Sequence, residues 1–361
     1  MTRVKAAVCH AYGAELTIEG IDLRAPGQGE VEVRLDAVAI CHSDISFIDG
    51  AWGGDLPAVY GHEAAGRVTA TGPGVTAYAP GDKVLVTLIK SCGSCGSCAS
   101  GAPVYCSDTA PAEPAMRLAD GTVVTKAMNC GAFAEAAIVH QSQLAPLPDD
   151  IPADVASLLA CGVITGVGAV VNSAQVRPGQ TVVVIGAGGV GLNAIQGARI
   201  AGAARIIAVD LSEEKLNDAK AFGATDGVLA SVDKPWQEVE RVTSGRKADA
   251  VFVTVGALPA YMQSLRFLAR GGTMYAVGMP HSGATAEYEP VILAAVGQGI
   301  KGSKMGDAVL ARDIPWMVDM YRQGRLKLDE LISNRWRLDQ INEAIADTKA
   351  GNARRNVIVL S

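Results

Sequence analysis

The segment 180–224, QTVVVIGAGGVGLNAIQGARIAGAARIIAVDLSEEKLNDAKAFGA, decides the fold of one part of this chain. It consists of an apolar strand, a glycine turn, a helix, a second apolar strand and a second helix. Strands that are apolar throughout and that alternate with helices are typical of a parallel sheet covered on both faces. The sequence therefore predicts an α/β domain with a doubly wound parallel sheet.

The glycine turn of this segment carries a phosphate-binding pattern. Gly186, Gly188 and Gly191 stand in G-x-G-x-x-G register, with Gly189 and Val190 between the last two, directly after a strand and before a helix. These glycines permit a tight turn, close approach of a pyrophosphate, and close packing of helix on strand. The helix N-terminus then offers N–H groups to phosphate oxygens. Taken alone, the pattern also fits a simple packing loop in a glycine-rich chain.

Asp210 favours the dinucleotide interpretation over the packing loop. It ends the second strand, nineteen residues after Gly191, where a carboxylate would bind ribose hydroxyls and repel a 2′-phosphate. We therefore expect a Rossmann domain that binds NAD rather than NADP. Lys215 lies one helical turn further on and either braces the ribose or is a solvated helix lysine.

The rest of the chain divides around this domain. Short β-branched runs punctuated by Gly, Pro and Asp dominate the first 150 residues, so a β-rich, barrel-like domain is expected there. We predict boundaries at 1–160 for this domain, 161–298 for the Rossmann domain, and 299–361 for a return to the first domain. The expected strands are 30–35, 64–72, 82–88, 248–256, 272–278 and 356–360, and the expected helical segments are 154–172, 261–272 and parts of 308–348.

Four closely spaced cysteines predict a structural metal site in the loop 91–107. Cys92, Cys95, Cys98 and Cys106 follow a Cys-x2-Cys-x2-Cys-x7-Cys pattern among small residues. Four thiolates converging on one point are a common tetrahedral zinc site. Disulfides or unpaired buried thiols are the alternative, and repeated Cys-x2-Cys spacing without an export signal favours the metal.

A second possible ligand set is scattered. Cys41, His62 and Cys161 each have an ordinary structural interpretation when taken singly, as a core cysteine or a hydrogen-bonded histidine. Together they offer two thiolates and one imidazole, an arrangement known for catalytic zinc that leaves the fourth position open.

Six motifs in this order resemble the zinc-dependent medium-chain alcohol dehydrogenases over essentially the whole chain. They are CHSD (41–44), GHEAAG (61–66), the four-cysteine loop, ACGVITGVG (160–168), GAGGVG (186–191) and Asp210. The resemblance is nearest to the glutathione-dependent formaldehyde dehydrogenase branch. It implies a GroES-like β-rich catalytic domain beside the Rossmann domain, one catalytic and one structural zinc per chain, NAD, and a homodimer or homotetramer.

The resemblance also assigns roles to residues. It implies that Cys41, His62 and Cys161 bind the catalytic zinc, that Glu63 lies behind the metal, and that Asp44 orients His62. It implies that Ser43 binds the substrate oxygen and passes its proton on while hydride moves to NAD. The implied cofactor contacts are those of His42 with phosphate or ribose, Thr165 with the nicotinamide and Arg355 with the pyrophosphate. Cys9, Cys130, His10, His140 and His281 match no site and are interpreted as structural.

One difference from many alcohol dehydrogenases bears on the proton path: Ser46 stands where a relay histidine is often found, so water or His42 would finish that path. Two departures from the formaldehyde dehydrogenase branch bear on the substrate. SDTAP (107–111) follows Cys106 without the expected arginine, and Trp52 replaces an expected acidic residue. Trp52 with Leu88 suggests an apolar pocket for a simple or aryl-alkyl alcohol, shaped further by the loops 107–130 and 279–300.

Composition excludes several functions and leaves others open. The net charge is −6 and there is no basic run, which argues against nucleic-acid binding. The apolar stretches are broken by glycines and are too short to span a membrane, and no export signal is recognised. We therefore expect a cytoplasmic protein that does not associate with a membrane. The alternatives are an S-(hydroxymethyl)glutathione dehydrogenase, another family reaction such as polyol oxidation or enal reduction, and a non-catalytic dinucleotide- or zinc-binding protein.

Overall fold

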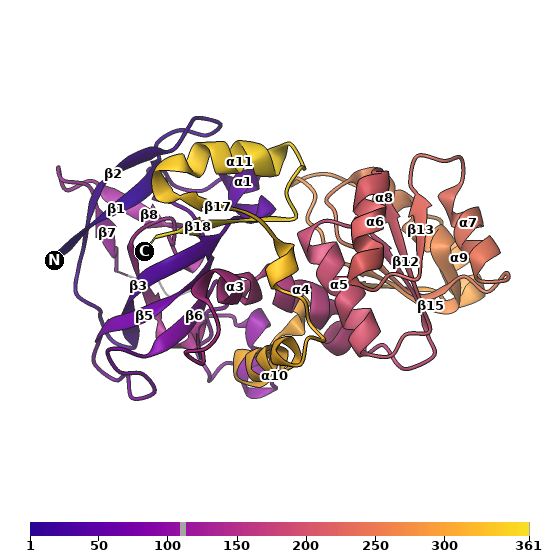
Figure 1. The fold of residues 1–361 in the computed structure, drawn as a ribbon, viewed down its shortest axis with the longest axis horizontal. Coiled ribbons are helices and arrows are strands. Elements are labelled where there is room, and N and C mark those ends of the chain that lie inside the picture. The colour runs from indigo at the N-terminus through magenta and orange to yellow at the C-terminus, as the bar shows by residue number, and fades with distance from the viewer. Residues whose placement is uncertain (109–112, 361) are drawn as a thin grey trace. The chain divides into compact units, whose positions relative to one another are not determined.

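The computed structural model describes residues 1–108 and 113–360, and these form two compact units. The first unit contains residues 1–161, 309–319 and the chain from 328 onward, and the second contains 162–308 and 320–327. In Figure 1 the yellow C-terminal segment returns to the indigo N-terminal strands. There β18 (Arg355–Val359) pairs antiparallel with β3 (Glu30–Ala39), which joins the two ends of the chain in one sheet.

Two β-structures make up the first unit. One is a closed barrel in the order β1-β2-β7-β8-β4, and the other is a seven-stranded sheet in the order β10-β6-β5-β3-β18-β17, with β9 also paired to β3. The strands are β1 (Thr2–Cys9), β2 (Thr17–Leu23), β4 (Ala58–Val59), β5 (Glu63–Thr71), β6 (Lys83–Thr87), β7 (Met116–Arg117), β8 (Val123–Lys126), β9 (Ala136–His140), β10 (Leu144–Pro146) and β17 (Ile332–Arg337).

Alternating side chains give β3, which pairs with β5, β9 and β18, one buried face. Val31, Val33 and Leu35 are buried, whereas Glu30, Glu32 and Arg34 between them are half-buried or exposed. Successive side chains of a strand point to opposite faces, so this pattern packs one face of β3 against the core. The α-helices of the unit are α1 (His42–Ile48), α2 (Gly96–Ala99), α3 (Ala153–Ser157), most of α10 (Leu310–Arg322) and α11 (Ile341–Lys349). α11 packs against α1 although they are far apart in the sequence (Figure 1).

The second unit has the predicted doubly wound form. Its six strands are parallel in the order β13-β12-β11-β14-β15-β16. They are β11 (Thr181–Ile185), β12 (Arg205–Asp210), β13 (Asp226–Leu229), β14 (Ala248–Val253), β15 (Leu268–Ala276) and β16 (Gly299–Gly302). The helices are α4 (Gly162–Gly168), α5 (Gly189–Ile200), α6 (Glu213–Phe222), α7 (Pro235–Val242), α8 (Leu258–Ser264) and α9 (Pro290–Val296). The predicted fold class is confirmed: every residue of β11 is buried, as expected of a central parallel strand.

The expected helix over 154–172 is interrupted. The helical run of α3 and the 3₁₀ turn η4 (Leu158–Ala160) stops at Cys161, and α4 starts after it. Cys161 has φ −145° and ψ −68°, which is not helical. An apolar periodicity of 3.6 cannot reveal such a break, because it registers burial and not the direction of one side chain.

The C-terminal part also differs from its predicted layout. β16 pairs with β15 in the parallel sheet, so the second unit continues to residue 308, ten residues beyond the predicted 298. The helical prediction for 261–272 holds only as far as α8 and the turn η6 (Leu265–Phe267), after which β15 starts. The helix α10 (Leu310–Arg322) lies in the region 308–348 as expected, but β17 in that region is a strand that the sequence did not predict.

Among the described residues no single helix is long and apolar enough to cross a bilayer. One bent pair, Ala153–Ala160 with Gly162–Ser173, reaches the required length and apolar composition together.

Candidate metal centre and dinucleotide turn

Cys41, His62, Glu63 and Cys161 come together in the first unit. One ligand atom from each lies within 4.8 Å of the others. Cys41 has an extended backbone immediately before α1, His62 immediately precedes β5, and Cys161 occupies the break between η4 and α4. The predicted ligands therefore project from the ends of three elements, where the backbone is free to direct side chains to one point.

Asp44 fixes this arrangement. Its Oδ1 accepts hydrogen bonds from Nδ1 of His62 at 3.0 Å and from the Gly61 N–H at 2.9 Å, and its Oδ2 accepts one from the Cys41 N–H at 3.0 Å. The Asp44 side chain is fully buried, as is that of His62. A carboxylate on one imidazole nitrogen sets the tautomer and directs the other nitrogen outward, as expected of a metal-binding histidine.

The donor atoms fit a zinc ion. Nε2 of His62 is buried and has no hydrogen-bond partner among the described residues. A hydrogen bond from the Cys161 thiol lowers the pKa of Cys41 well below its ordinary value, and the same contact raises the pKa of Cys161. The two sulfurs share one proton and lie beside an imidazole nitrogen that has no hydrogen-bond partner. Sulfur and imidazole donors bind zinc in preference to calcium or magnesium, which prefer oxygen ligands.

Glu63 and Arg355 form a buried ion pair beside the ligands. Nη2 of Arg355 lies 2.7 Å from Oε1 of Glu63 and donates to the Ile40 carbonyl at 3.2 Å. Burial raises the pKa of Glu63 to about 7, against the opposing charge of Arg355. The sequence linked Arg355 with pyrophosphate and did not anticipate its pairing with Glu63, because no local signal joins residues so far apart.

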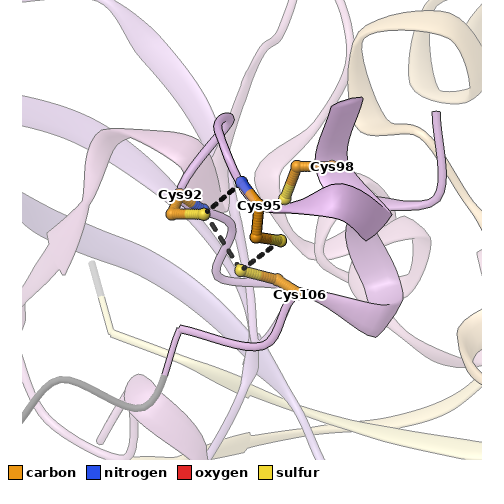
Figure 2. Close-up of side chains that lie close together, drawn as sticks. All are labelled: Cys92, Cys95, Cys98 and Cys106. Atoms are coloured by element: carbon orange, nitrogen blue, oxygen red, sulfur yellow. Dashed lines mark hydrogen bonds between the residues drawn. The ribbon is translucent and has the colours of Figure 1, made fainter. Parts of the chain in front are cut away.

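The four cysteines of the loop form the second cluster. Figure 2 shows the thiols of Cys92, Cys95, Cys98 and Cys106 turned toward one another, and the four sulfurs lie within 4.8 Å. Backbone N–H groups point at the sulfurs: that of Cys95 donates to Cys92 at 3.3 Å, and that of Cys92 donates to Cys106 at 3.3 Å. The Ser107 N–H lowers the pKa of Cys95 to about 5. All eight cysteines of the chain are described and none forms a disulfide, so the cluster has the donors of a tetrahedral zinc site.

The glycine turn has the geometry of its motif. Gly186 has φ +96°, and a Cβ on Gly191 would lie 1.8 Å from the Gly186 carbonyl oxygen. Gly188 has open space at the same position and precedes the first residue of α5. The Asp210 carboxylate accepts hydrogen bonds from the Ala187 N–H at 2.7 Å and the Ser212 N–H at 3.0 Å, which holds it beside the turn. Gly189 and Val190 form the first turn of α5.

The other predicted site residues are distributed over both units. In the second unit Thr165 is buried in α4 with its hydroxyl 3.7 Å from Sδ of Met305, and Lys215 is half-buried in α6. In the first unit Ser43 is half-buried and His42 is exposed, both in the first turn of α1, and Ser46 follows one turn later.

The predicted pocket residues Trp52 and Leu88 are both half-buried in the first unit. The ring of Phe47 meets Trp52 edge-on with centroids 4.9 Å apart, and it stacks on Tyr60 at 6.2 Å. The sequence did not single out Phe47; its spacing on α1 relative to Ser43 was the available signal. Within the predicted loop 107–130, residues 109–112 lie outside the described part of the chain.

Comparison with known proteins agrees with this geometry. Residues 27–149 match the family described as alcohol dehydrogenase GroES-like domain, and residues 189–323 match zinc-binding dehydrogenase. The chain is 36% identical to an NDMA-dependent alcohol dehydrogenase of Amycolatopsis methanolica, over 99% of both sequences. It is 37% identical to a probable S-(hydroxymethyl)glutathione dehydrogenase of Schizosaccharomyces pombe, over 98% of this chain and 96% of that one. The benzyl alcohol dehydrogenase of Acinetobacter calcoaceticus superposes with a TM-score of 0.93 at 30% identity and covers 100% of both chains.

This chain belongs to the zinc-binding alcohol dehydrogenase family of the medium-chain dehydrogenase/reductases, as its motifs predicted. It is an oxidoreductase of the alcohol dehydrogenase type, and its nearness to the formaldehyde dehydrogenase-like branch is confirmed.

Proposed function

We propose that this protein is a zinc- and NAD-dependent dehydrogenase that oxidises a primary or secondary alcohol reversibly to an aldehyde or ketone. The observation that carries the proposal is the convergence of Cys41, His62 and Cys161, with Asp44 directing the unpaired Nε2 of His62 toward the two sulfurs. The second cysteine cluster would hold a structural zinc.

The reaction divides between bound groups and side chains. When bound, zinc would supply a Lewis acid for the alcohol oxygen and NAD would supply the hydride acceptor. Ser43 would accept a hydrogen bond from the substrate hydroxyl and pass its proton outward, and the exposed His42 or water would receive it, because Ser46 is a weak proton carrier. Asp44 and the Glu63–Arg355 pair would hold the ligand shell in place.

NAD is favoured over NADP by the position of Asp210. Its carboxylate is held at the glycine turn by the Ala187 and Ser212 N–H groups, where it would bind ribose hydroxyls and repel an added phosphate. Lys215, Thr165 and Arg355 are proposed to complete the contacts with the cofactor.

The aromatic neighbours Trp52 and Phe47 favour an apolar or aryl-alkyl alcohol, and one structural relative is named for benzyl alcohol. A second candidate substrate is S-(hydroxymethyl)glutathione, which is favoured by the name of the S. pombe relative. Against it stand Trp52 in place of an acidic residue and the SDTAP sequence in place of an arginine that would bind a carboxylate.

We further propose a cytoplasmic homodimer or homotetramer. The absence of a disulfide among the eight cysteines, all of which the structure describes, is consistent with a reducing compartment. A non-catalytic binding protein is the alternative from another class, and it would not need two thiolates and an imidazole converging on an open metal position.

A single experiment distinguishes the candidate substrates from one another and the enzyme from a non-catalytic binding protein. Zinc content and NADH formation are measured on one preparation against primary, secondary, aryl and polyol alcohols and S-(hydroxymethyl)glutathione, with NADP in parallel and with NDMA as an added oxidant. We expect two zinc ions per chain, one for each ligand cluster, and turnover of an apolar or aryl alcohol with NAD. Two zinc ions without turnover of any substrate, with or without NDMA, would instead favour the binding protein.

A further inference from the structure

A buried hydrogen-bond chain leads to the backbone beside Cys161. The hydroxyl of Thr87, the last residue of β6, donates to the Ala160 carbonyl at 2.6 Å. The Thr87 carbonyl in turn accepts from Nε2 of Gln143 at 2.9 Å. Thr87 is 0% exposed and Gln143 is 1% exposed, so both contacts are shielded from water.

The contact with Ala160 acts on a metal ligand through one rigid group. The Ala160 carbonyl and the Cys161 N–H belong to the same planar peptide unit, so fixing the carbonyl fixes the orientation of that plane. The plane matters here because Cys161 leaves the helix at φ −145° and ψ −68°. A hydrogen bond on the preceding peptide therefore holds the N–Cα bond of Cys161 in place, and with it the position from which the Cys161 side chain reaches Cys41 and His62.

Thr87 also connects the two sides of the ligand cluster. In the β5–β6 ladder Thr87 is directly paired with Glu63, the residue after His62. The strand that starts directly after His62 and the peptide that precedes Cys161 thus meet at one threonine.

Gln143 holds the far side of Thr87. Besides the Thr87 carbonyl, its amide lies 3.2 Å from the Asn129 carbonyl and 3.5 Å from Sγ of Cys130. Its Oε1 accepts from the His140 N–H at 3.1 Å. Asn129 has φ +61°, a left-handed conformation that costs free energy in a non-glycine residue and that Gln143 helps to retain. Both the nitrogen and the oxygen of the Gln143 amide are therefore hydrogen-bonded, which fixes the side chain in one orientation.

We propose that Thr87, supported by Gln143, is a positioning residue that sets the direction of Cys161 and so the retention of metal at the Cys41–His62–Cys161 site. The inference rests on the proposed zinc site. Groups that orient metal ligands from behind typically change metal affinity 10- to 100-fold when removed.

The test follows zinc release from the purified protein into excess chelator with a colorimetric indicator. Zinc should leave in two kinetic phases, one from each cysteine-containing cluster. The phase of the Cys41–His62–Cys161 site is the one that is absent in the Cys161→Ala variant. Thr87→Val preserves shape but removes the donor, and we expect it to accelerate this phase about tenfold. Thr87→Ser keeps the hydroxyl and should restore the wild-type rate, and the phase of the four-cysteine cluster serves as an internal control.

Thr243→Val is the matched control. Thr243 is 7% exposed and donates to the Val239 carbonyl at 2.7 Å in the second unit, so the variant loses the same kind of bond away from either cluster. Equal release rates for Thr87→Val, Thr243→Val and wild type would overturn the inference. If Thr87→Val does not fold, Gln143→Met is measured in its place, and wild-type release from that variant overturns it equally. If the wild-type protein holds no zinc at the Cys41–His62–Cys161 site, the proposed site is overturned, and the inference with it.

Discussion

Ser43 is the side chain on which the proposed proton path depends. It lies between the proposed zinc ligand Cys41 and Asp44, which binds His62, at the start of α1 and is half-buried. We predict that Ser43→Ala lowers kcat by at least about 100-fold, the usual contribution of a positioned proton carrier. The KM for NAD should stay near the wild-type value, because the glycine turn that is proposed to bind NAD lies in the second unit. Steady-state kinetics with NAD and the best alcohol give both parameters.

Ser264→Ala controls for the general loss of a serine hydroxyl. Ser264 is 0% exposed and donates to the Tyr261 carbonyl, so its removal costs stability without touching the proposed path. It should keep wild-type kcat. Wild-type turnover by Ser43→Ala would remove Ser43 from the mechanism.

Gly188 and Gly191, in the turn between β11 and α5, are expected to serve different purposes: Gly188 cofactor binding and Gly191 close packing. A Cβ on Gly191 would overlap the Gly186 carbonyl oxygen, whereas a Cβ on Gly188 has open space. We predict that Gly191→Ala destabilises the protein by about 2 kcal/mol or more, the cost of overpacking a tight contact. Gly188→Ala should unfold at the wild-type temperature but bind NAD more than about tenfold less tightly, a loss of ~1.4 kcal/mol.

Thermal unfolding and NAD titration of the same two variants check this distinction. The expected pattern is a lower melting temperature for Gly191→Ala alone and weaker NAD binding for Gly188→Ala. Wild-type NAD affinity in Gly188→Ala would show that the cofactor does not approach the backbone of this turn.

The turn that leads into β3 gives the fold a pH dependence. Glu30 accepts hydrogen bonds from Arg24 at 2.6 and 3.0 Å and from the Gly27 N–H at 2.8 Å. Burial raises the pKa of Glu30, but these bonds outweigh it and hold the pKa below its ordinary value of 4.5. The stabilisation is therefore complete above pH 4.5 and is lost as the pH falls through the lower folded-state value.

We predict that Glu30→Gln lowers stability by about 2 kcal/mol at pH 7, as expected for charge-assisted hydrogen bonds. The difference from wild type should begin to shrink below pH 4.5 and should vanish once the pH is below the lowered folded-state pKa of Glu30, where both proteins carry a neutral side chain. Glu32→Gln is the control. Glu32 stands two residues after Glu30 on β3 and accepts a hydrogen bond from the hydroxyl of Thr69 on β5, a donor that carries no charge. Melting curves at decreasing pH from pH 7 test this, and a difference that does not shrink as the pH falls below 4.5 contradicts it.

Local motifs and tertiary contacts account for what the sequence could and could not predict. The glycine turn and the four-cysteine loop are short in sequence, so spacing alone located them. The Ile40–Arg355 contact joins residues 315 apart, and the Thr87–Ala160 contact joins residues 73 apart. No periodicity encodes such pairs. The break at Cys161 was hidden for a related reason: the flanking residues are apolar on both sides, so burial is uniform where the backbone changes direction.

Viewed as a whole, the protein has an uncovered apolar surface at one edge of the parallel sheet. α9 has the sequence PVILAAV, and none of its residues is buried. Val291 is 69% exposed and Ile292 is 46% exposed, and Ile300 on the edge strand β16 is 43% exposed. An unpaired strand edge beside exposed aliphatic side chains is a surface that proteins usually cover. We therefore expect this edge to form the contact of the proposed homo-oligomer.

A charge on α9 tests that expectation. Val291→Glu would place a carboxylate in the covered surface, where desolvation without a partner is unfavourable. We predict a multiple of the 37.2 kDa chain mass for wild type by light scattering, and a shift toward monomer for Val291→Glu. Val232→Glu, at an aliphatic residue 40% exposed in the loop after β13, should leave the mass unchanged. A monomeric wild type refutes the oligomer itself. An oligomer that is equally stable in both variants would move the contact to another surface, because a buried carboxylate at Val291 could not be accommodated without loss of affinity.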